Sequence, residues 1–314
     1  MAAKKDTFGS ICAVAVTYNI GEAFAPCFAS LKPQVNHAIL VNTSNDGGVT
    51  TRALEALQAQ NAKFTDIIPC PQNNLGLAQN LGIARALELG YDWVLLLDHD
   101  SHLEDGMIDA MKHAYQQDPL HNQIGLIAPY LDDPAIRNPP KYLREWQRYI
   151  FTQSTFSADT PVLDNILCVP ASGSLIPRRI LDRPQPMDEG FVIDNIDTDF
   201  CLKLVTSGQR IIAVRDAKLT HKIGDRKHHS LLGIEMTTTN HSPLRRYYFN
   251  RNRIAVWKRH TAKHPAFLLF DSMRMAYELW RILLLESNKN EKLNYFMAGL
   301  FDGLRGLSGP KPGT

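Results

Sequence analysis

The stretch WVLLLDHDS, residues 93–101, joins an uninterrupted apolar run to two carboxylates that follow it directly. An apolar run without alternation is typical of a strand that is buried on both faces, as in a parallel sheet covered by helices. Such sheets bind their ligands in the crevice beyond the carboxyl ends of the strands. The stretch therefore predicts an α/β fold and places Asp98 and Asp100 at its binding edge.

The segments around this stretch alternate between short apolar runs and runs of helical period, which predicts a mostly parallel sheet with helices on both faces. We expect residues 125–128 to form an edge strand or the neighbour of 93–97, and residues 129–163 to form a loop with a helix that covers the cleft. After about residue 230 the strand pattern ends, so we expect a catalytic domain at 1–230 and a helical region at 231–314 that packs on it. The remaining strands are expected at 11–16, 38–41, 66–68, 171–176 and 210–214, and the helices at 22–31, 50–61, 78–89, 105–117, about 197–207, 243–264, 265–286 and 289–306.

Length and composition exclude several protein classes. The chain has 314 residues and 35.3 kDa, which fits one large α/β domain or one domain with a helical appendage. No apolar run approaches the roughly 20 residues of a membrane span, and the first ten residues lack a signal-peptide core, so we expect a cytoplasmic protein. Five scattered cysteines without a C-x-x-C motif argue against a disulfide framework or a zinc ribbon.

Polar side chains follow two further strands at the point where each ends. Thr17, Tyr18 and Asn19 follow the first strand, and Asn42 follows the second. We expect them at the same sheet edge as the D-x-D pair. Closely spaced carboxylates suit Mg²⁺ or Mn²⁺, which prefer oxygen ligands and can also grip a diphosphate. The alternative is a turn that caps the next helix, beginning near Ser101.

The segment 191–203, FVIDNIDTDFCLK, carries three acids at the start of an amphipathic helix: Asp194, Asp197 and Asp199. The helix dipole favours acids in a first turn whatever their function. The functional alternative is a general base at the cleft that takes a proton from an acceptor hydroxyl.

A basic block runs from His221 to His264, with ten lysines and arginines against two acids, a net charge of +8, and six of the eleven histidines. Such a block serves phosphate, nucleic acid or a membrane surface, or else forms a solvated helix face. His221 leaves a strand and could ligate a metal beside phosphate-binding cations. Arg245 and Tyr248 share one helix face, compatible with a single phosphate or sugar site.

The segment NLGLAQNLG, residues 74–82, leads from a loop into a helix. Asn74 and Gly76 there could bring a helix N-terminus close to an anion or a sugar hydroxyl, although a tight structural turn is an equal alternative. The segment is neither a Walker A loop nor G-x-G-x-x-G, so nucleoside triphosphate hydrolysis and dinucleotide-dependent dehydrogenation lose support.

Apolar stretches at 267–270 and 279–285 lie next to the basic block. This arrangement is typical of an interfacial helix at the cytoplasmic face of a membrane. The alternative is that the helix packs on the catalytic domain or on a second subunit.

Taken together, these segments resemble the inverting family 2 glycosyltransferases with the GT-A fold, and most of all bacterial rhamnosyltransferases. The resemblance spans nearly the whole chain. It rests on VTYN (16–19), NLGLAQNLGI (74–83), WVLLLDHDS (93–101), ASGSLI (171–176), DEGFVIDNIDTDFCLK (188–203), LTHKIGDRK (219–227), NHSPLRRYYFNRN (240–252) and DGLRG (302–306).

The resemblance implies a role for each matching residue. Asp197 would be the catalytic base, Asp98 would contact the nucleotide, and Asp100 and His221 would hold the metal, Mg²⁺ or Mn²⁺. We expect Gly173, Asp194 and Asn195 to contact the acceptor. The other residues expected to bind the nucleotide sugar are Thr17, Tyr18, Asn19, Asn42, Asn74, Gly76, Arg226, Lys227, Arg245, Tyr248 and Arg251.

The activity that the resemblance implies is transfer of L-rhamnose from dTDP-L-rhamnose to a hydroxyl of a glycan or glycolipid acceptor, with inversion at the anomeric carbon. Two alternatives stay open. A nucleotidyltransferase acting on a sugar phosphate would use a similar metal-bound sheet edge, and a nucleic-acid-binding protein would use the basic block. Our expectation is a sugar-nucleotide enzyme without a nucleic-acid partner.

Overall fold

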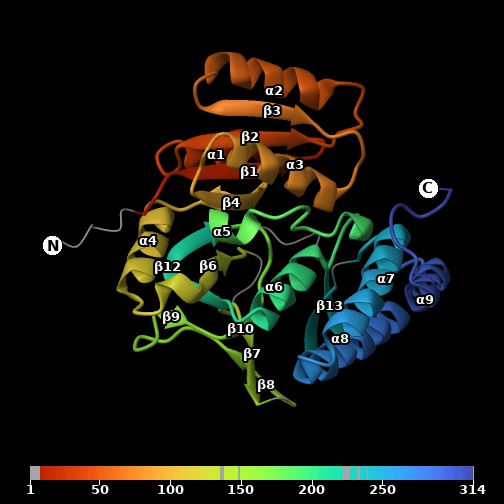
Figure 1. Ribbon diagram of the computed structural model, residues 1–314. Helices are drawn as coiled ribbons and strands as arrows, with labels where there is room; N and C mark the ends of the chain where they lie inside the picture. The colour runs from red at the N-terminus through yellow and green to blue at the C-terminus, as the bar shows by residue number, and fades with distance from the viewer. Residues whose placement is uncertain are drawn as a thin grey trace.

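The structure is a computed structural model that describes residues 8–134, 138–147, 149–221, 227–231, 234–238 and 240–313. For residues 146–147, 227–231 and 234–237 only the backbone is described. Helices and strands alternate along the first part of the chain, and three long helices follow at its end (Figure 1).

A central sheet crosses the molecule in the order β3-β2-β1-β4-β11-β6-β12-β5, with β9 paired to β12. The pairs among β1 to β4 are parallel, as is β6 with β12, whereas β11 runs antiparallel between β4 and β6. The mostly parallel sheet is therefore confirmed. Its strands are β1 (Ile11–Thr17), β2 (His37–Asn42), β3 (Thr65–Pro69), β4 (Trp93–Asp98), β5 (His102–Leu103), β6 (Ile124–Asp132), β9 (Val162–Leu163), β11 (Leu175–Pro177) and β12 (Arg210–Thr220).

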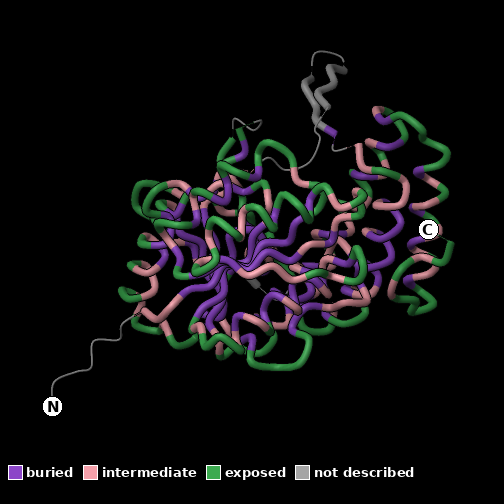
Figure 2. Tube along the Cα trace, turned by 90° about the horizontal axis from the view of Figure 1, so that it is seen from above, coloured by how far each residue is buried: buried purple, intermediate pink, exposed green. Residues whose placement is uncertain are grey.

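Helices cover both faces of this sheet and form two separate apolar cores. One core joins the sheet to α3 (Leu75–Glu88) and α6 (Ile196–Thr206), and the other joins it to α1 (Phe24–Leu31), α2 (Val49–Gln60) and α4 (Met107–Gln117). Figure 2 shows the buried backbone gathered between the two helical layers. The full burial of β4 on both faces follows from its uninterrupted apolar sequence. Short helical pieces occur at α5 (Arg178–Leu181), η1 (His121–Gln123) and η2 (Glu189–Phe191).

The segment 129–163 differs from the expected loop and helix. In its described part the chain continues β6 to Asp132 and then forms β7 (Tyr142–Gln147) and β8 (Ile150–Ser154), which pair with β10 (Ile166–Cys168) in a second small sheet. Tyr142 and Leu143 are buried against the main core, and aromatic residues of this kind favour strands. The predicted covering helix is therefore wrong for the described residues.

Two further strand predictions are corrected. Residues 125–128 belong to β6, an inner strand of the sheet that β11 separates from β4. They therefore form neither an edge strand nor the strand next to β4. Residues 171–174 form a turn rather than a strand, because Gly173 has a φ of +84° and a Cβ there would come within 2.5 Å of Pro129. Only Leu175–Pro177 pairs in the sheet.

The C-terminal part contains three helices that lie side by side at one end of the molecule, α7 (Pro243–His260), α8 (Pro265–Leu284) and α9 (Lys289–Arg305) (Figure 1). The expected absence of strands after residue 230 is wrong, since β13 (Lys227–Leu231) pairs with β14 (Ile234–Thr238). The expected domain boundary at residue 230 falls inside β13 and stays a prediction. No helix in the described residues is long and apolar enough to cross a bilayer.

Candidate active site

The ends of three strands meet at one edge of the sheet, as their sequences predict. Register pairs Val16 with Asp98 across β1 and β4, and Thr17 with Asn42 across β1 and β2. Because these strands are parallel, the residues that follow each of them emerge side by side. The site is built on this edge.

The loops after β1 and β2 are joined by hydrogen bonds. Thr43 donates through its N–H and its hydroxyl to the carbonyl of Thr17, at 2.9 and 3.0 Å. The Asn19 N–H donates to Ser44 Oγ at 2.8 Å. Tyr18 stands between these anchored positions with 45% of its surface exposed, so its ring is available to a ligand.

Asp98, Asp100 and His221 form a group that could hold a metal ion. One ligand atom from each lies within 4.8 Å of the other two. His221 sits between the carboxylates, with Nε2 at 3.5 Å from Asp98 Oδ2 and Nδ1 at 3.5 Å from Asp100 Oδ1. Ligands around one Mg²⁺ or Mn²⁺ stand roughly 3 to 4 Å apart, so the group needs only a small adjustment to take such an ion.

Local pairing explains how His221 reaches the carboxylates from far along the chain. β5 follows the D-x-D turn at once and pairs antiparallel with the end of β12, Thr220 opposite His102. The His221 N–H donates to the carbonyl of Asp132 at 3.1 Å. β12 therefore delivers His221 over the turn that holds Asp98 and Asp100.

Two serines that sequence reasoning missed support this group. Ser172 Oγ accepts the N–H of Asp98 at 3.0 Å and lies 2.6 Å from Ser101 Oγ. Ser101 Oγ in turn lies 3.0 Å from His221 Nδ1. The turn at 171–174 thus fixes both the carboxylate backbone and the imidazole, a role that needs a turn rather than the predicted strand.

The charges at the group favour a bound cation. Burial raises the pKa of the Asp98 carboxyl, His221 opposes this rise, and the negative charge of Asp100 adds to it. A divalent ion would remove the repulsion between the two carboxylates. Two oxygen donors and one imidazole also match the ligands that Mn²⁺ and Mg²⁺ accept.

Asp197 occupies the first turn of α6, and the charge of Asp98 in the metal group acts on its carboxyl. Its Oδ1 accepts the N–H of Thr198 at 2.8 Å. Burial raises its pKa to about 6, and the negative charges of Asp194 and Asp98 contribute to the rise. A carboxylate with this pKa is a stronger base than an ordinary one and is still ionised near neutral pH.

Asp194 and Arg245 link this turn to α7. The Arg245 guanidinium donates to both oxygens of Asp194, at 2.9 Å from Nη2 and 3.0 Å from Nε. The charges of Asp98 and Asp197 also raise the pKa of Arg245, which places its guanidinium among the acids of the site. Arg245 therefore carries a positive charge that interacts with Asp98 and Asp197 as well as with its partner Asp194.

Asp199, two residues after Asp197, anchors α6 to α7 and is fully buried. His260 Nε2 lies 2.8 Å from its Oδ1, Arg259 reaches the same oxygen at 3.2 Å, and Lys203 binds Oδ2 at 2.6 Å. Burial opposes its ionisation, but these partners outweigh that effect and lower the pKa of Asp199 to about 2. The helix dipole explains an acid in the first turn of α6 but does not predict these partners of Asp199.

Six other predicted site residues are engaged in structural contacts. Asn74 caps α3 and binds the Glu189 carbonyl, and a Cβ on Gly76 would come within 2.6 Å of the Asp188 carbonyl. Gly173 shapes the serine turn, and Asn195 donates to the Phe249 carbonyl at 2.9 Å.

Tyr248 and Arg251, both buried, hold the C-terminal tail, through the Lys311 N–H and the Gly309 carbonyl respectively. Both side chains thus make structural contacts, and the donor contact expected of each stays a prediction. Arg226 lies outside the described residues, as does the side chain of Lys227.

The basic block is largely neutralised where it is described. Arg246 pairs with Glu278 and Glu286, and Arg253 pairs with Asp271 and Glu278, all five side chains being buried. Arginines held in this way inside the helical region cannot form an extended surface for a nucleic-acid backbone.

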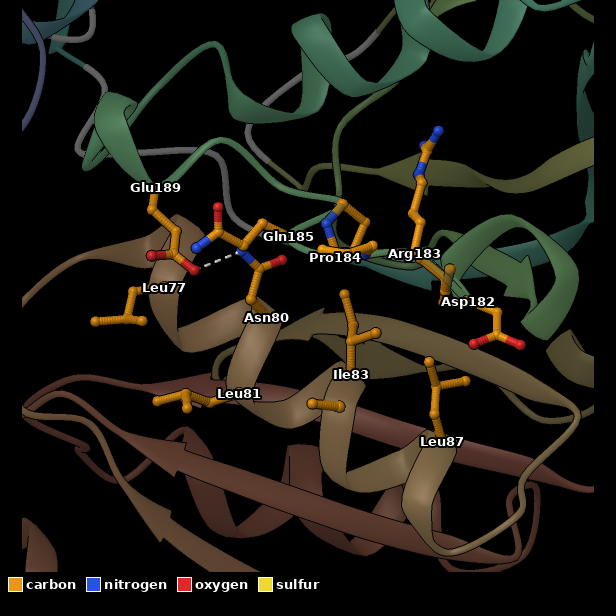
Figure 3. A pocket seen from close by; sticks show the side chains of 13 residues that line it. Leu77, Asn80, Leu81, Ile83, Leu87, Asp182, Arg183, Pro184, Gln185 and Glu189 are labelled. Carbon is orange, nitrogen blue, oxygen red and sulfur yellow. Dashed lines mark hydrogen bonds between the residues drawn. The ribbon is translucent and has the colours of Figure 1, made fainter.

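A pocket of about 420 Å³ lies apart from the group of Asp98, Asp100 and His221, between α3 and residues 181–189. Figure 3 shows apolar side chains of α3, among them Leu81 and Leu87, on one wall and Glu189 beside Asn80 at one end, with Arg183 pointing away. Asn80 Nδ2 donates to Glu189 Oε1 at 2.9 Å. None of the residues that line it belongs to the metal group or to the Asp194–Asp197 turn.

Comparison with known proteins identifies the fold. No protein-family profile matches the sequence. The curated dTDP-rhamnosyl transferase RfbF of Shigella flexneri is 26% identical over 249 residues, which cover 76% of this chain and 79% of RfbF.

Solved glycosyltransferase structures match at lower identity. Residues 1–349 of S. aureus TarS align with a TM-score of 0.58 and 12% identity over 94% of this chain and 80% of that one. The mannosyltransferase PcManGT of Pyrobaculum calidifontis, solved with GDP-Man and Mn²⁺, gives 0.54 and 13% over 97% and 77%. GalNAc-T7, solved with UDP, GalNAc and Mn²⁺, gives 0.59 and 14% over 81% of this chain, which spans only 48% of the GalNAc-T7 chain.

These likenesses, together with the mixed sheet flanked by helices, confirm the fold prediction. The chain is a glycosyltransferase with the GT-A fold, and it resembles the rhamnosyltransferases.

Proposed function

We propose that this enzyme transfers L-rhamnose from dTDP-L-rhamnose to a hydroxyl of a glycan or lipid-linked acceptor. The similarity to the dTDP-rhamnosyl transferase of Shigella flexneri supports this choice of donor. The mechanism rests on two observations: Asp98, Asp100 and His221 form a group that could hold a metal ion, and burial and the charges of Asp194 and Asp98 raise the pKa of the Asp197 carboxyl.

The donor would lie along the edge formed by β1, β2 and β4. The exposed ring of Tyr18 and the amide of Asn42 would contact the nucleoside, beside the Thr17 and Asn19 loops that the hydrogen bonds hold in place. Asp98, Asp100 and His221 would hold Mg²⁺ or Mn²⁺. When bound, such an ion neutralises negative charge on the diphosphate as the sugar leaves.

Cationic side chains would complete the diphosphate site. Arg245 has the position for this role, because its guanidinium lies among the acids of the site while 41% of its side chain remains exposed. We keep Arg226 and Lys227 as further candidates on sequence grounds. Tyr248 and Arg251 would act from behind, by holding the tail and η2 in place.

Asp197 would accept the proton of the acceptor hydroxyl as that oxygen attacks the anomeric carbon. The attack comes from the face opposite the diphosphate, so one displacement inverts the anomeric configuration. Asp194 would orient the acceptor or Arg245, and the turns at Gly173 and Asn195 would shape the acceptor side of the cleft. No protonated side chain is needed at the leaving group, since the metal site takes that charge.

A panel of nucleotide sugars tests this proposal. The purified enzyme is incubated with a mixture of glycan and lipid-linked acceptors and with dTDP-rhamnose, UDP-glucose, UDP-N-acetylglucosamine or GDP-mannose, each with Mg²⁺, Mn²⁺ or a chelator, and released nucleoside diphosphate is measured. We expect release from dTDP-rhamnose alone, and only with the metal. Release from another donor in its place would overturn the donor assignment, and pyrophosphate from a triphosphate and sugar phosphate would indicate a nucleotidyltransferase.

A further inference from the structure

The helical region exposes an unusual amount of apolar surface. Among the described residues sixteen large apolar side chains are exposed, and ten of them lie between Leu269 and Leu307. Six belong to α8, each between 38% and 57% exposed: Leu269, Met273, Tyr277, Trp280, Leu283 and Leu284. Apolar side chains scattered singly need no explanation, but a cluster of this kind marks an interaction surface.

The six α8 side chains form one stripe. At 3.6 residues per turn they fall within about one third of the helix circumference. The opposite side of α8 carries its buried residues, including Asp271 and Glu278, which pair with arginines of α7. α8 therefore packs on the rest of the protein through its inner side, and the apolar stripe does not take part in that packing.

The charges beside the stripe are positive. The exposed Arg274 lies along one margin, with its guanidinium group 5.7 Å from the ring of Phe270. Within α8, which is described throughout, both acids are buried, so its outer side carries no carboxylate. Arg305 at the end of α9 lies in the same way over the exposed ring of Phe301, 4.1 Å from its centroid.

This chemistry favours a lipid surface over a second copy of the chain. Two antiparallel copies of α8 meeting through the stripe about a twofold axis would bring like-charged arginine margins together, with no acid of α8 to neutralise them. An anionic bilayer offers hydrocarbon to the stripe and phosphate to its margins. Tyr277 and Trp280, stacked with centroids 5.8 Å apart, are the side-chain types that gather at the headgroup level.

We propose that the outer face of α8, from Leu269 to Leu284, docks on an anionic phospholipid surface. α8 packs on β8 of the catalytic domain through Phe270, whose ring centroid lies 5.2 Å from that of Phe151. Docking would thus hold the catalytic domain at the surface that carries lipid-linked acceptors. The inference concerns membrane binding and does not depend on the donor sugar.

Vesicle sedimentation tests this inference on the full chain. We expect binding to phosphatidylcholine vesicles that contain about 30% phosphatidylglycerol, weakening as salt rises and much weaker for phosphatidylcholine alone. The variant M273Q/L284Q should bind at least about tenfold more weakly, because two apolar side chains leave the interface. The control V49Q/L120Q alters two equally exposed apolar side chains far from α8 and should bind like the wild type.

Two control measurements test whether the variants are folded and whether the protein is monomeric. Thermal unfolding of both variants should match the wild type, since the replaced side chains are exposed. Light scattering without lipid should give the mass of one chain for each protein. Equal binding of M273Q/L284Q and wild type, equal binding to neutral vesicles, or a dimer that M273Q/L284Q dissociates would overturn the proposal.

Discussion

The pH dependence of turnover follows from the setting of Asp197. An ordinary aspartate, with a pKa of 3.8, is ionised throughout the neutral and mildly acidic range, whereas Asp197 has a pKa of about 6. Because a general base works only when it is deprotonated, kcat/KM of the free enzyme should fall on the acid side of this value. Relative to the plateau, activity should be about one half at pH ~6 and about one eleventh at pH ~5, where an unshifted base would keep over about nine tenths.

Asp194→Asn tests the cause of this shift. The negative charge of Asp194 raises the pKa of Asp197, and Asp194 also neutralises part of the charge on Arg245. Removing that charge therefore lowers the pKa of Asp197 in both ways. The acid limb of the profile should move to lower pH in this variant, whatever happens to the plateau.

The assay follows nucleoside diphosphate release from donor and acceptor between pH ~4.5 and ~8.5, with kcat/KM taken at low donor concentration. Circular dichroism at each pH checks that the protein stays folded. A wild-type limb near pH ~4, or a limb that stays in place in Asp194→Asn, would refute the reasoning.

Three further predictions concern the supports of the site. Asp199→Asn leaves His260 and its neighbours without their anion and should lower the free energy of unfolding by about 3 kcal/mol at neutral pH. Because the folded pKa of Asp199 is depressed to about 2, its contribution is present above 3.8 and is lost as pH falls from there toward 2, so acid melts of wild type and variant should converge in that window. Gly303→Ala places a Cβ 2.7 Å from the Arg251 carbonyl, between α7 and α9, and should cost about 1 to 3 kcal/mol in denaturant unfolding, whereas Gly21→Ala, with open space around it, should cost almost nothing. Mn²⁺ at one hundred times Kd should raise the free energy of unfolding of the wild type by about 2.7 kcal/mol, seen as a higher melting temperature; His221→Ala should lose this stabilisation, while the exposed His113→Ala keeps it. Unchanged unfolding in Asp199→Asn or Gly303→Ala, or full Mn²⁺ stabilisation of His221→Ala, would contradict the corresponding assignment.

The sequence predicts the sheet well where one strand pattern decides the outcome. The apolar runs at 11–16, 38–41 and 93–97 are buried on both sides, so their hydrophobicity alone marks them as strands, and the polar residues behind them mark the edge where they end. β7 and β8 escaped prediction because their residues are mixed in polarity and β8 is partly exposed. The brief strand β11 was mistaken for a longer one because a turn at Gly173 is invisible in apolar content.

In the site too, the residues marked by a local sequence pattern could be predicted, and the contacts between distant residues could not. Asp98, Asp100 and Asp197 stand next to local patterns, the end of an apolar run and the start of a helix, which a linear sequence displays. The partnership of Asp199 with His260 joins residues 61 positions apart, and the serines behind His221 act through backbone groups. Tyr248 and Arg251 matched the expected motif, yet their contacts depend on how the C-terminal tail folds back onto α7, which no local pattern encodes.

The central claim is that one aspartate receives the acceptor proton across the cleft from a metal-held diphosphate. Asp197→Asn removes the carboxylate that takes the proton and leaves the Asp98, Asp100 and His221 group unchanged. Calorimetry with dTDP and Mn²⁺, run beside the turnover assay, should show affinity within about threefold of wild type and turnover lower by at least about a thousandfold. Turnover near the wild-type rate in this variant, with binding intact, would contradict the account.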